Sequence, residues 1–175
     1  MNKTRLSPNH WLTAGFDALQ HLGPQALAAE PLARRLGTTK GSFYWHFKDV
    51  PAFHAALLNQ WRQNTLVRLA NLTDQSESSA QSLREFGKDL LNDPSEASMR
   101  NWAVSNADVA TMLQEIDRLR LNYIAALLRQ VGFGNANFAH ALLAALLGLP
   151  QVLPDQPDQR AAAFDTLLDT VLALS

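Results

Sequence analysis

Apolar residues recur along this chain three and four positions apart, the spacing of amphipathic α-helices, and no segment shows the alternation of a β-strand. The first such run consists of Trp11, Leu12, Phe16, Leu19 and Leu22. Ser7 and Pro8 precede it in the order that favours a helix start, and Gly23 with Pro24 ends it. The pattern therefore predicts an all-α chain.

The same spacing predicts about nine helices in all. A long helix is expected over residues 50–72, and others at 83–91, 96–105, 109–131 and 137–149. Beyond Pro157 a final helix presents Phe164, Leu167, Leu168, Val171 and Leu172. The serine-rich stretch 73–79 favours a loop near a boundary between two parts of the chain.

We expect two domains. The first is a three-helix head, residues 1–50, and the second is a helical body, residues 51–175. Helix 50–72 is too long to belong only to the small head, so it is expected to join the two.

Residues 27–58 contain two short helices around a glycine turn, followed by the start of the long helix, which is the pattern of a helix-turn-helix. Gly37 occupies the turn, where a left-handed backbone is accessible to glycine, and Thr39 can cap the second short helix. The inner faces of these helices are expected to comprise Leu32, Ala33 and Leu36, and Phe43 and Phe47.

The second short helix, expected over residues 40–47, concentrates cationic, hydroxylic and aromatic side chains in about two turns. Such a surface suits phosphates and base edges better than catalysis. Lys40 and Ser42, with close approach permitted by Gly41, are the best candidates to contact base edges. Aromatic residues at helical spacing are more often core than contact residues, and for Trp45 both interpretations stay open.

Charge is unevenly divided along the chain. The formal net charge is −1, yet residues 1–50 carry six Lys or Arg against three Asp or Glu, and the remaining residues carry nine against thirteen. A basic head on an acidic body concentrates the attraction for anions in the segment that holds the helix-turn-helix. The asymmetry is modest and supports DNA binding without proving it.

Other functional classes find little support in the sequence. Cysteine is absent, and the histidines, His10, His21, His46, His54 and His140, include no pair at the i, i+4 spacing of a helical metal site. Carboxylates are scattered as on helix surfaces, so we expect no enzyme, no metal and no cofactor. The longest apolar run, residues 138–149, falls short of the about 20 residues of a membrane span, and no signal sequence is evident. A cytoplasmic protein without a membrane partner is expected.

The string LARRLGTTKGSFYWHFKD, residues 32–49, resembles the tetracycline-repressor (TetR) family of bacterial transcriptional regulators. The likeness spans roughly residues 8–60, and residues 100–103 and 117–120 are similar to one branch of that family. It implies an all-α homodimer with a DNA-binding head and a body for ligand binding and dimerisation. Phosphate contacts are implied for Tyr44 and His46, whereas Lys48 could equally be a solvated lysine. The candidate DNA contacts are Thr39, Lys40, Gly41, Ser42, Tyr44, Trp45, His46 and Lys48.

One departure from the family pattern lies at the start of the first short helix. Family members often have a threonine there, which caps the helix and touches a phosphate, but this chain has Ala28 and Ala29. Losing such a cap typically costs about 1 kcal/mol. The departure bears on DNA affinity rather than on the fold.

Two further sets of residues are assigned to the body. The family likeness implies a small-molecule pocket, for which the candidates are Phe86, Met99, Trp102, Met112, Ile116 and Tyr123, although each could be ordinary core. Arg100, Asp117 and Arg120 are expected to form a structural salt bridge rather than a ligand contact. The last two helices have more apolar surface than such a body readily buries, which predicts a dimer interface at Leu142, Leu146, Phe164, Leu168 and Val171.

The sequence thus predicts a homodimeric DNA-binding regulator, most simply a repressor that an unknown small-molecule effector releases from a palindromic operator in double-stranded DNA. The alternative is a dimeric ligand-binding or protein-interaction module of the same fold with weak DNA binding.

Overall fold

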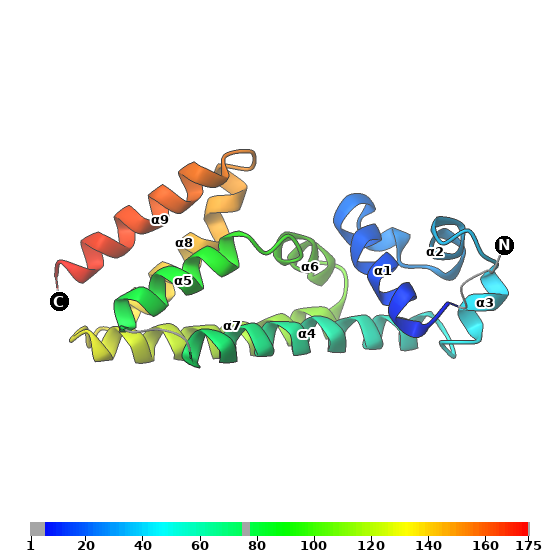
Figure 1. Ribbon diagram of the computed structural model, residues 1–175, viewed down its shortest axis with the longest axis horizontal. Helices are drawn as coiled ribbons and strands as arrows, with labels where there is room; N and C mark the ends of the chain where they lie inside the picture. Colours follow the sequence, from blue (N-terminus) through cyan, green and yellow to red (C-terminus); the bar gives the residue numbers. More distant parts are fainter. Residues whose placement is uncertain (1–5, 75–77, 175) are drawn as a thin grey trace. The chain divides into compact units, whose positions relative to one another are not determined.

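A computed structural model describes residues 6–74 and 78–174, and every regular element in that part of the chain is a helix (Figure 1). The elements are α1 (Pro8–Leu22), a 3-10 turn η1 (Pro24–Ala26), α2 (Ala29–Arg35), α3 (Lys40–Tyr44), α4 (Val50–Asp74), α5 (Ser79–Leu91), α6 (Glu96–Ala103), α7 (Ala107–Gln130), α8 (Asn137–Val152) and α9 (Pro157–Leu172). The all-α class and the number of helices are confirmed. Lys3 and Arg5 of the basic head, and residues 75–77 of the expected loop, lie outside the described residues.

Residue contacts divide the chain into two compact units. The first runs to Asn64 and also takes in Pro94–Leu113, and the second comprises Thr65–Asp93 and the chain from Gln114 onward. Two of the boundaries between the units fall inside helices, after Asn64 in α4 and after Leu113 in α7. These two long helices therefore contribute residues to both units. The first unit is therefore larger than the head of residues 1–50 that the sequence suggests, because it also includes the first part of α4, α6 and the start of α7.

Aromatic rings form the core of the first unit. Phe43 is fully buried between Trp11, at 5.3 Å between ring centroids, and Phe53, at 5.5 Å. Gly15 allows this packing, because a Cβ atom there would lie 2.7 Å from Cζ of Phe53. α1 and α4 consequently approach each other more closely than a side chain at Gly15 would permit.

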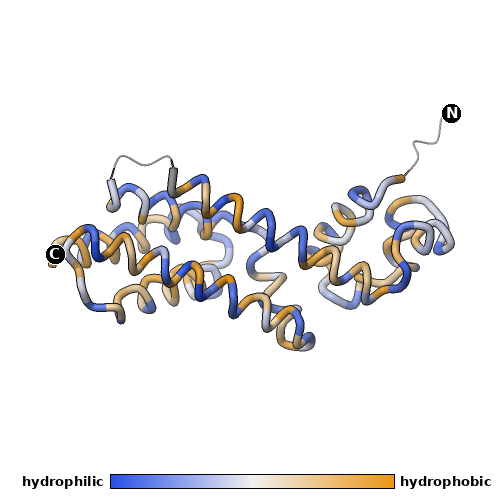
Figure 2. The backbone as a smooth tube through the Cα atoms, turned by 90° about the horizontal axis from the view of Figure 1, so that it is seen from below, coloured by the Kyte–Doolittle hydropathy of each residue, from blue (hydrophilic) through white to orange (hydrophobic). Residues whose placement is uncertain are grey.

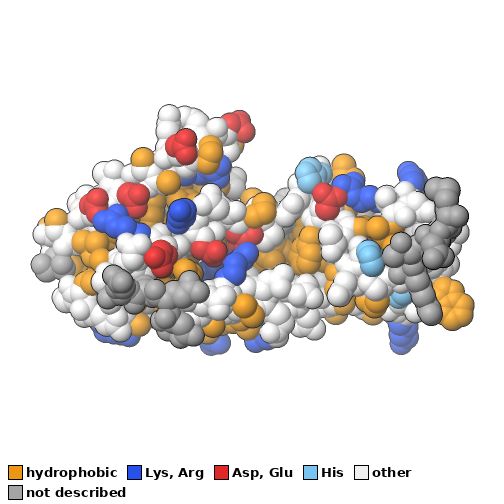
Figure 3. All heavy atoms as spheres, in the orientation of Figure 1, with side chains coloured by type: hydrophobic (Ala, Val, Ile, Leu, Met, Phe, Trp, Pro, Cys, Tyr) orange, Lys and Arg blue, Asp and Glu red, His pale blue; other side chains and the backbone are white. Residues whose placement is uncertain are grey.

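The second unit packs α5, α8 and α9 on one another, with side chains of α7 in the same core. Figure 2 shows hydrophobic and hydrophilic residues alternating along these helices, as amphipathic packing requires. Phe164 of α9 lies directly on Gly87 of α5, where a Cβ atom would be only 2.1 Å from its ring. Arg84 flanks this contact with ion pairs to Asp165, at 3.2 Å, and to Asp169. Acidic and basic side chains are interspersed on this unit's surface in Figure 3.

The five residues proposed from the sequence for a dimer interface have a different place in the structure. Leu142, Leu146, Phe164, Leu168 and Val171 are all buried in the core of the second unit. The physical reason is that α8 and α9 turn their largest apolar side chains toward α5 and each other within one chain. Any contact with a second copy would have to use other faces of these helices.

Candidate nucleic-acid interface

The turn between α2 and α3 is set by local sequence. Gly37 has a φ of +61°, in the left-handed region predicted for it, and the amide of Thr38 bonds back to the carbonyl of Ala33 at 2.9 Å. The hydroxyl of Thr39 then accepts a hydrogen bond from the amide of Ser42 at 3.3 Å. This cap confirms the expected role of Thr39 and starts α3 at Lys40.

α3 is shorter than expected, since it ends at Tyr44 rather than near Phe47. The amides of His46 and Phe47 both bond to the carbonyl of Phe43, each at 3.0 Å, so the helix closes in a tight last turn. Asp49 then caps α4 by accepting a bond from the amide of Ala52 at 2.7 Å. Only residues 45–49 separate the end of α3 from the start of α4.

One side of α3 and of the residues after it is buried, and the other side is accessible. Phe43 and Phe47 are buried in the aromatic core, as predicted. Lys40, Gly41, Tyr44, Trp45 and Lys48 are exposed, and Ser42 and His46 are half-buried. Every candidate DNA contact that follows the cap is thus at least partly accessible.

Trp45 is 88% exposed, which is unusual for the largest apolar side chain. This exposure removes the core interpretation that the sequence left open for it. Tyr44 and His46 are more constrained: the Tyr44 ring packs edge-on against Phe43 at 5.3 Å, and the His46 ring lies 6.4 Å from Trp11. Both residues pack on aromatic side chains of the core and stay partly accessible.

Gly41 has no structural reason to be glycine within this chain. Its φ is not positive, and a Cβ atom there would meet only Oγ1 of Thr39 at an ordinary 3.7 Å. Glycine inside a helix costs about 1 kcal/mol relative to alanine. The missing side chain is consistent with the close approach of another molecule to α3.

The cations of this region divide into paired and unpaired ones. Arg34 pairs with Glu30 at 3.2 Å, and Arg35 pairs with Asp17. Lys40 and Lys48 have no acidic partner among the described residues. The uncompensated positive charge therefore lies at the start of α3 and just beyond its end, beside the exposed aromatic residues.

The start of α2 shows the departure noted in the sequence. Ala28 is its N-cap residue and offers no side-chain hydrogen bond to the free amides of the first turn. An expected phosphate contact is therefore missing from this end of the surface.

Known proteins share both sequence and fold with this chain. It is 39% identical over 54 residues to the tetracycline repressor protein class A from transposon 1721 of Escherichia coli, a match that covers 31% of this chain and 25% of that protein. A transcriptional regulator from Rhodococcus sp. Rha1 has the same fold, with a TM-score of 0.80 at 21% identity over 96% of this chain and 97% of its own. A TetR-family transcriptional regulator from Streptomyces coelicolor gives 0.79 at 15% identity, over 94% and 87%. The sequence likeness to the tetracycline repressor is confined to 54 residues, and the fold is shared with a TetR-family regulator. No family model matches this chain.

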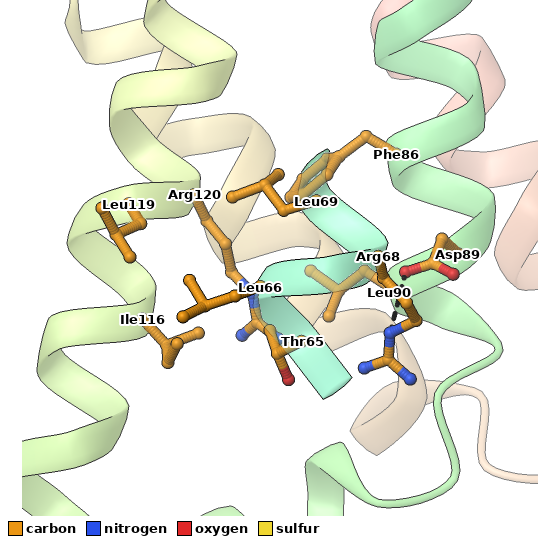
Figure 4. A pocket seen from close by; sticks show the side chains of 10 residues that line it. All are labelled: Thr65, Leu66, Arg68, Leu69, Phe86, Asp89, Leu90, Ile116, Leu119 and Arg120. Atoms are coloured by element: carbon orange, nitrogen blue, oxygen red, sulfur yellow. Dashed lines mark ion pairs between the residues drawn. The ribbon is translucent and has the colours of Figure 1, made fainter. Parts of the chain in front are cut away.

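The chain also has a cavity in its second unit, between α4, α5 and α7 (Figure 4). It encloses about 340 Å³ of space free of atoms, part of it open to solvent, and its widest part has room for about one water molecule. The lining residues are Thr65, Leu66, Arg68, Leu69, Phe86, Asp89, Leu90, Ile116, Leu119 and Arg120.

The cavity contains two of the six pocket residues proposed from the sequence, Phe86 and Ile116. Tyr123 lies beside them, with its ring 5.6 Å from that of Phe86. Met99, Trp102 and Met112 belong to the first unit, where the Trp102 ring packs on His54 at 5.1 Å. The pocket assignment of these three stays a prediction that this cavity does not support.

Of the polar residues that line the cavity, sequence reasoning named Arg120 and missed Thr65, Arg68 and Asp89. Arg120 is only 3% exposed and pairs with Asp117 at 3.2 Å, the structural salt bridge expected of those two residues. Arg100 pairs with Glu96 at 2.6 Å in the first unit. Thr65, Arg68 and Asp89 carry no motif that would mark them. Only their i, i+3 and i, i+4 spacing from apolar neighbours places them on inner helix faces.

No helix in the described ranges is long and apolar enough to cross a membrane. Within the same ranges no three acidic, histidine or cysteine side chains are grouped as metal ligands.

Proposed function

We propose that this protein is a transcriptional repressor that binds operator DNA through the surface of residues 39–48. The observation that carries the proposal is the pair Lys40 and Lys48, which have no acidic partner in the described part of the chain and flank exposed aromatic residues on the outer side of a helix anchored by Phe43. Phosphates attract such cations, and an α-helix fits the major groove.

The contacts are proposed to divide by position. Lys40 and Ser42, at the N-terminal end of α3, meet base edges, and the bare backbone of Gly41 lets the helix approach them. Tyr44, His46 and Lys48 hold phosphates and thereby fix the register of the helix on the duplex. Trp45 supplies contact area beside them.

The active form is proposed to be a homodimer, because two heads one helical turn apart would recognise a pseudo-palindromic operator. Support comes from the outer face of α8, where Ala141, Ala144, Gly148 and Val152 follow helical spacing and are at least partly exposed. A Cβ atom at Gly148 would meet nothing within 4 Å inside the chain. A second copy could pack closely against this face.

Release by an effector is proposed to involve α4. This helix begins next to the DNA-contacting segment, at Val50, and further along it supplies Thr65, Leu66, Arg68 and Leu69 to the cavity. A ligand that binds one arrangement of α4 better than another would change the separation of the two heads in a dimer.

Binding-site selection on randomised duplexes tests the function directly. We expect enrichment of a palindrome by the wild-type protein, and relaxed preference in Lys40→Ala and Ser42→Ala by about 1–3 kcal/mol per affected base pair. Failure to enrich any palindrome would favour the alternative, a ligand-binding or protein-interaction module with weak DNA binding. The observation that favours this alternative is the start of α2, where Ala28 provides no capping side chain.

A further inference from the structure

The cavity of the second unit has a largely apolar lining. Leucine, isoleucine and phenylalanine side chains from α4, α5 and α7 form most of its wall (Figure 4). The polar residues of the wall are Thr65, Arg68, Asp89 and Arg120. Pockets of this composition bind mainly apolar small molecules, and their few polar groups set the orientation and the specificity of the ligand.

Thr65 has a hydroxyl group without a hydrogen-bond partner among the described residues. The residue is only 5% exposed, and in Figure 4 its side chain lies at the cavity, between side chains of α5 and α7. Buried hydroxyls are usually paired, and a threonine inside a helix can bond to a carbonyl one turn earlier. Thr111, Thr166 and Thr170 do so, each with the carbonyl four residues before it. Thr65 therefore offers hydrogen-bonding capacity to a molecule in the cavity.

Arg68 adds a second buried donor, one helical turn further along α4. Its Nε atom is buried and has no hydrogen-bond partner in the same part of the chain. The Oδ2 atom of Asp89 lies 3.6 Å from this Nε, close enough for an ion pair but beyond hydrogen-bonding distance. Thr65 and Arg68 are three residues apart, so they share one face of the helix. Since the arginine Nε can only donate and the hydroxyl can do either, the group that suits both is a hydrogen-bond acceptor.

The charged groups of the cavity favour a ligand without charge. Arg68 forms ion pairs with Asp89 and Asp93, and Arg120 forms one with Asp117. A ligand carboxylate would have to share these cations with the carboxylates already present. Burial raises the pKa of Asp89, and this effect exceeds that of any one neighbouring charge. Of these charges, Asp93 reinforces it, whereas Arg68 and Arg120 oppose it. A charged ligand group would meet the same cost of burial.

We propose that the cavity binds an uncharged, mostly apolar molecule with a carbonyl oxygen, which accepts the hydrogen bonds that the Thr65 hydroxyl and Nε of Arg68 lack within the chain. The proposal rests on the proposed function and deepens it, because it names the chemical class of the effector. The apolar wall buries the rest of the ligand. Since the space is narrow, lining side chains must move apart to admit it.

Four ligands of one shape test the preference for an uncharged acceptor by isothermal titration calorimetry on the full chain. They are 4-phenyl-2-butanone, 3-phenylpropionate, 4-phenyl-2-butylamine and isopentylbenzene, whose phenylethyl groups carry a ketone, a carboxylate, an ammonium group and a hydrocarbon branch. We expect the ketone to bind at least about tenfold more tightly than the acid and the amine, because neither charge has to be buried. A charged ligand that binds as tightly as the ketone would overturn the proposal. Absence of ketone binding would also overturn it.

Thr65→Val replaces the hydroxyl by a methyl group of similar size. It should weaken ketone binding about fivefold, the effect of one lost hydrogen bond, and leave the affinity for isopentylbenzene within about twofold. Thr65→Ser keeps a hydroxyl and should keep most of the ketone affinity. Thr166→Val is the matched control, because it removes an exposed hydroxyl of α9 that already bonds to the carbonyl of Ala162, and it should change neither affinity. Unchanged ketone affinity in Thr65→Val would overturn the proposal, since the hydroxyl would then not contact the ligand.

The wild-type protein decides the question even if Thr65→Val fails to fold, because the four-ligand series does not need the variant. Operator binding without ligand is measured separately by fluorescence anisotropy. A protein that binds the ketone but no operator would contradict the proposed function alone. A protein that binds operator and prefers a charged ligand would contradict only the ligand class.

Discussion

A single side chain, Lys48, gives the sharpest test of the DNA-binding surface. Its charge is uncompensated by any acidic group in the described part of the chain, whereas the exposed Arg34 is paired with Glu30. Lys48→Ala should weaken the binding of specific and non-specific DNA alike and lower the slope of log affinity against log salt by about one unit per subunit, because each subunit releases one counterion fewer. Fluorescence anisotropy titrations at several salt concentrations measure both.

Arg34→Ala is the matched control for Lys48→Ala. It removes the same charge from the same unit, but from an existing ion pair, so the salt dependence should change little. Equal changes in the two variants would contradict a specific role for Lys48.

At single positions the sequence was informative wherever the cause is local. Thr39 was expected as a helix cap and Gly37 as a left-handed turn residue, and the structure confirms both. The polar residues of the cavity could not be predicted in the same way. The burial of Arg120 and Thr65 depends on α4, α5 and α7 meeting in space, and no local pattern encodes that meeting.

Two packed helices limit the size of the side chains at their contact, and the contact between α5 and α9 is the clearest case. Gly87→Ala would force a methyl group into the ring of Phe164, so it should lower the free energy of unfolding by about 1–3 kcal/mol. Urea denaturation followed by circular dichroism provides the measurement. Gly134→Ala adds the same methyl group where nothing lies within 4 Å and should change stability by less than about 0.5 kcal/mol. A tolerant Gly87→Ala variant would show that α9 can move away from α5.

The helices themselves were predictable because their apolar periodicity is strong, but their partners were not. The many leucines of α8 and α9 predict apolar helix faces, but the pattern does not tell which face packs inside the chain. The structure turns Leu146 and Leu168 inward, and α8 keeps a face of small residues outside. Trp102 illustrates the same point, because its apolar helix face packs on His54 rather than around the cavity.

At the scale of the whole molecule, two variants of α8 test the proposed dimer. One changes the outer face of the helix and the other changes the core. Ala144→Arg places a charge on the outer face of α8, so it should give a folded monomer with unchanged helical circular dichroism. Leu146→Glu buries a carboxylate in the core and should instead lower the melting temperature sharply or prevent folding. Multi-angle light scattering combined with thermal melts distinguishes the two outcomes. A folded wild-type monomer at micromolar concentration would contradict the dimer.

The exposure of Trp45 gives the protein a built-in optical reporter. The other three tryptophans, Trp11, Trp61 and Trp102, are buried, so collisional quenchers such as acrylamide or iodide should act chiefly on the emission of Trp45. Operator DNA that covers α3 would shield this indole and reduce the quenching constant. A Trp45→Phe variant should lose the quenchable fraction and show no such change on DNA addition. Equal quenching with and without bound operator would place Trp45 outside the contact, and titration of the unlabelled protein would then need another signal.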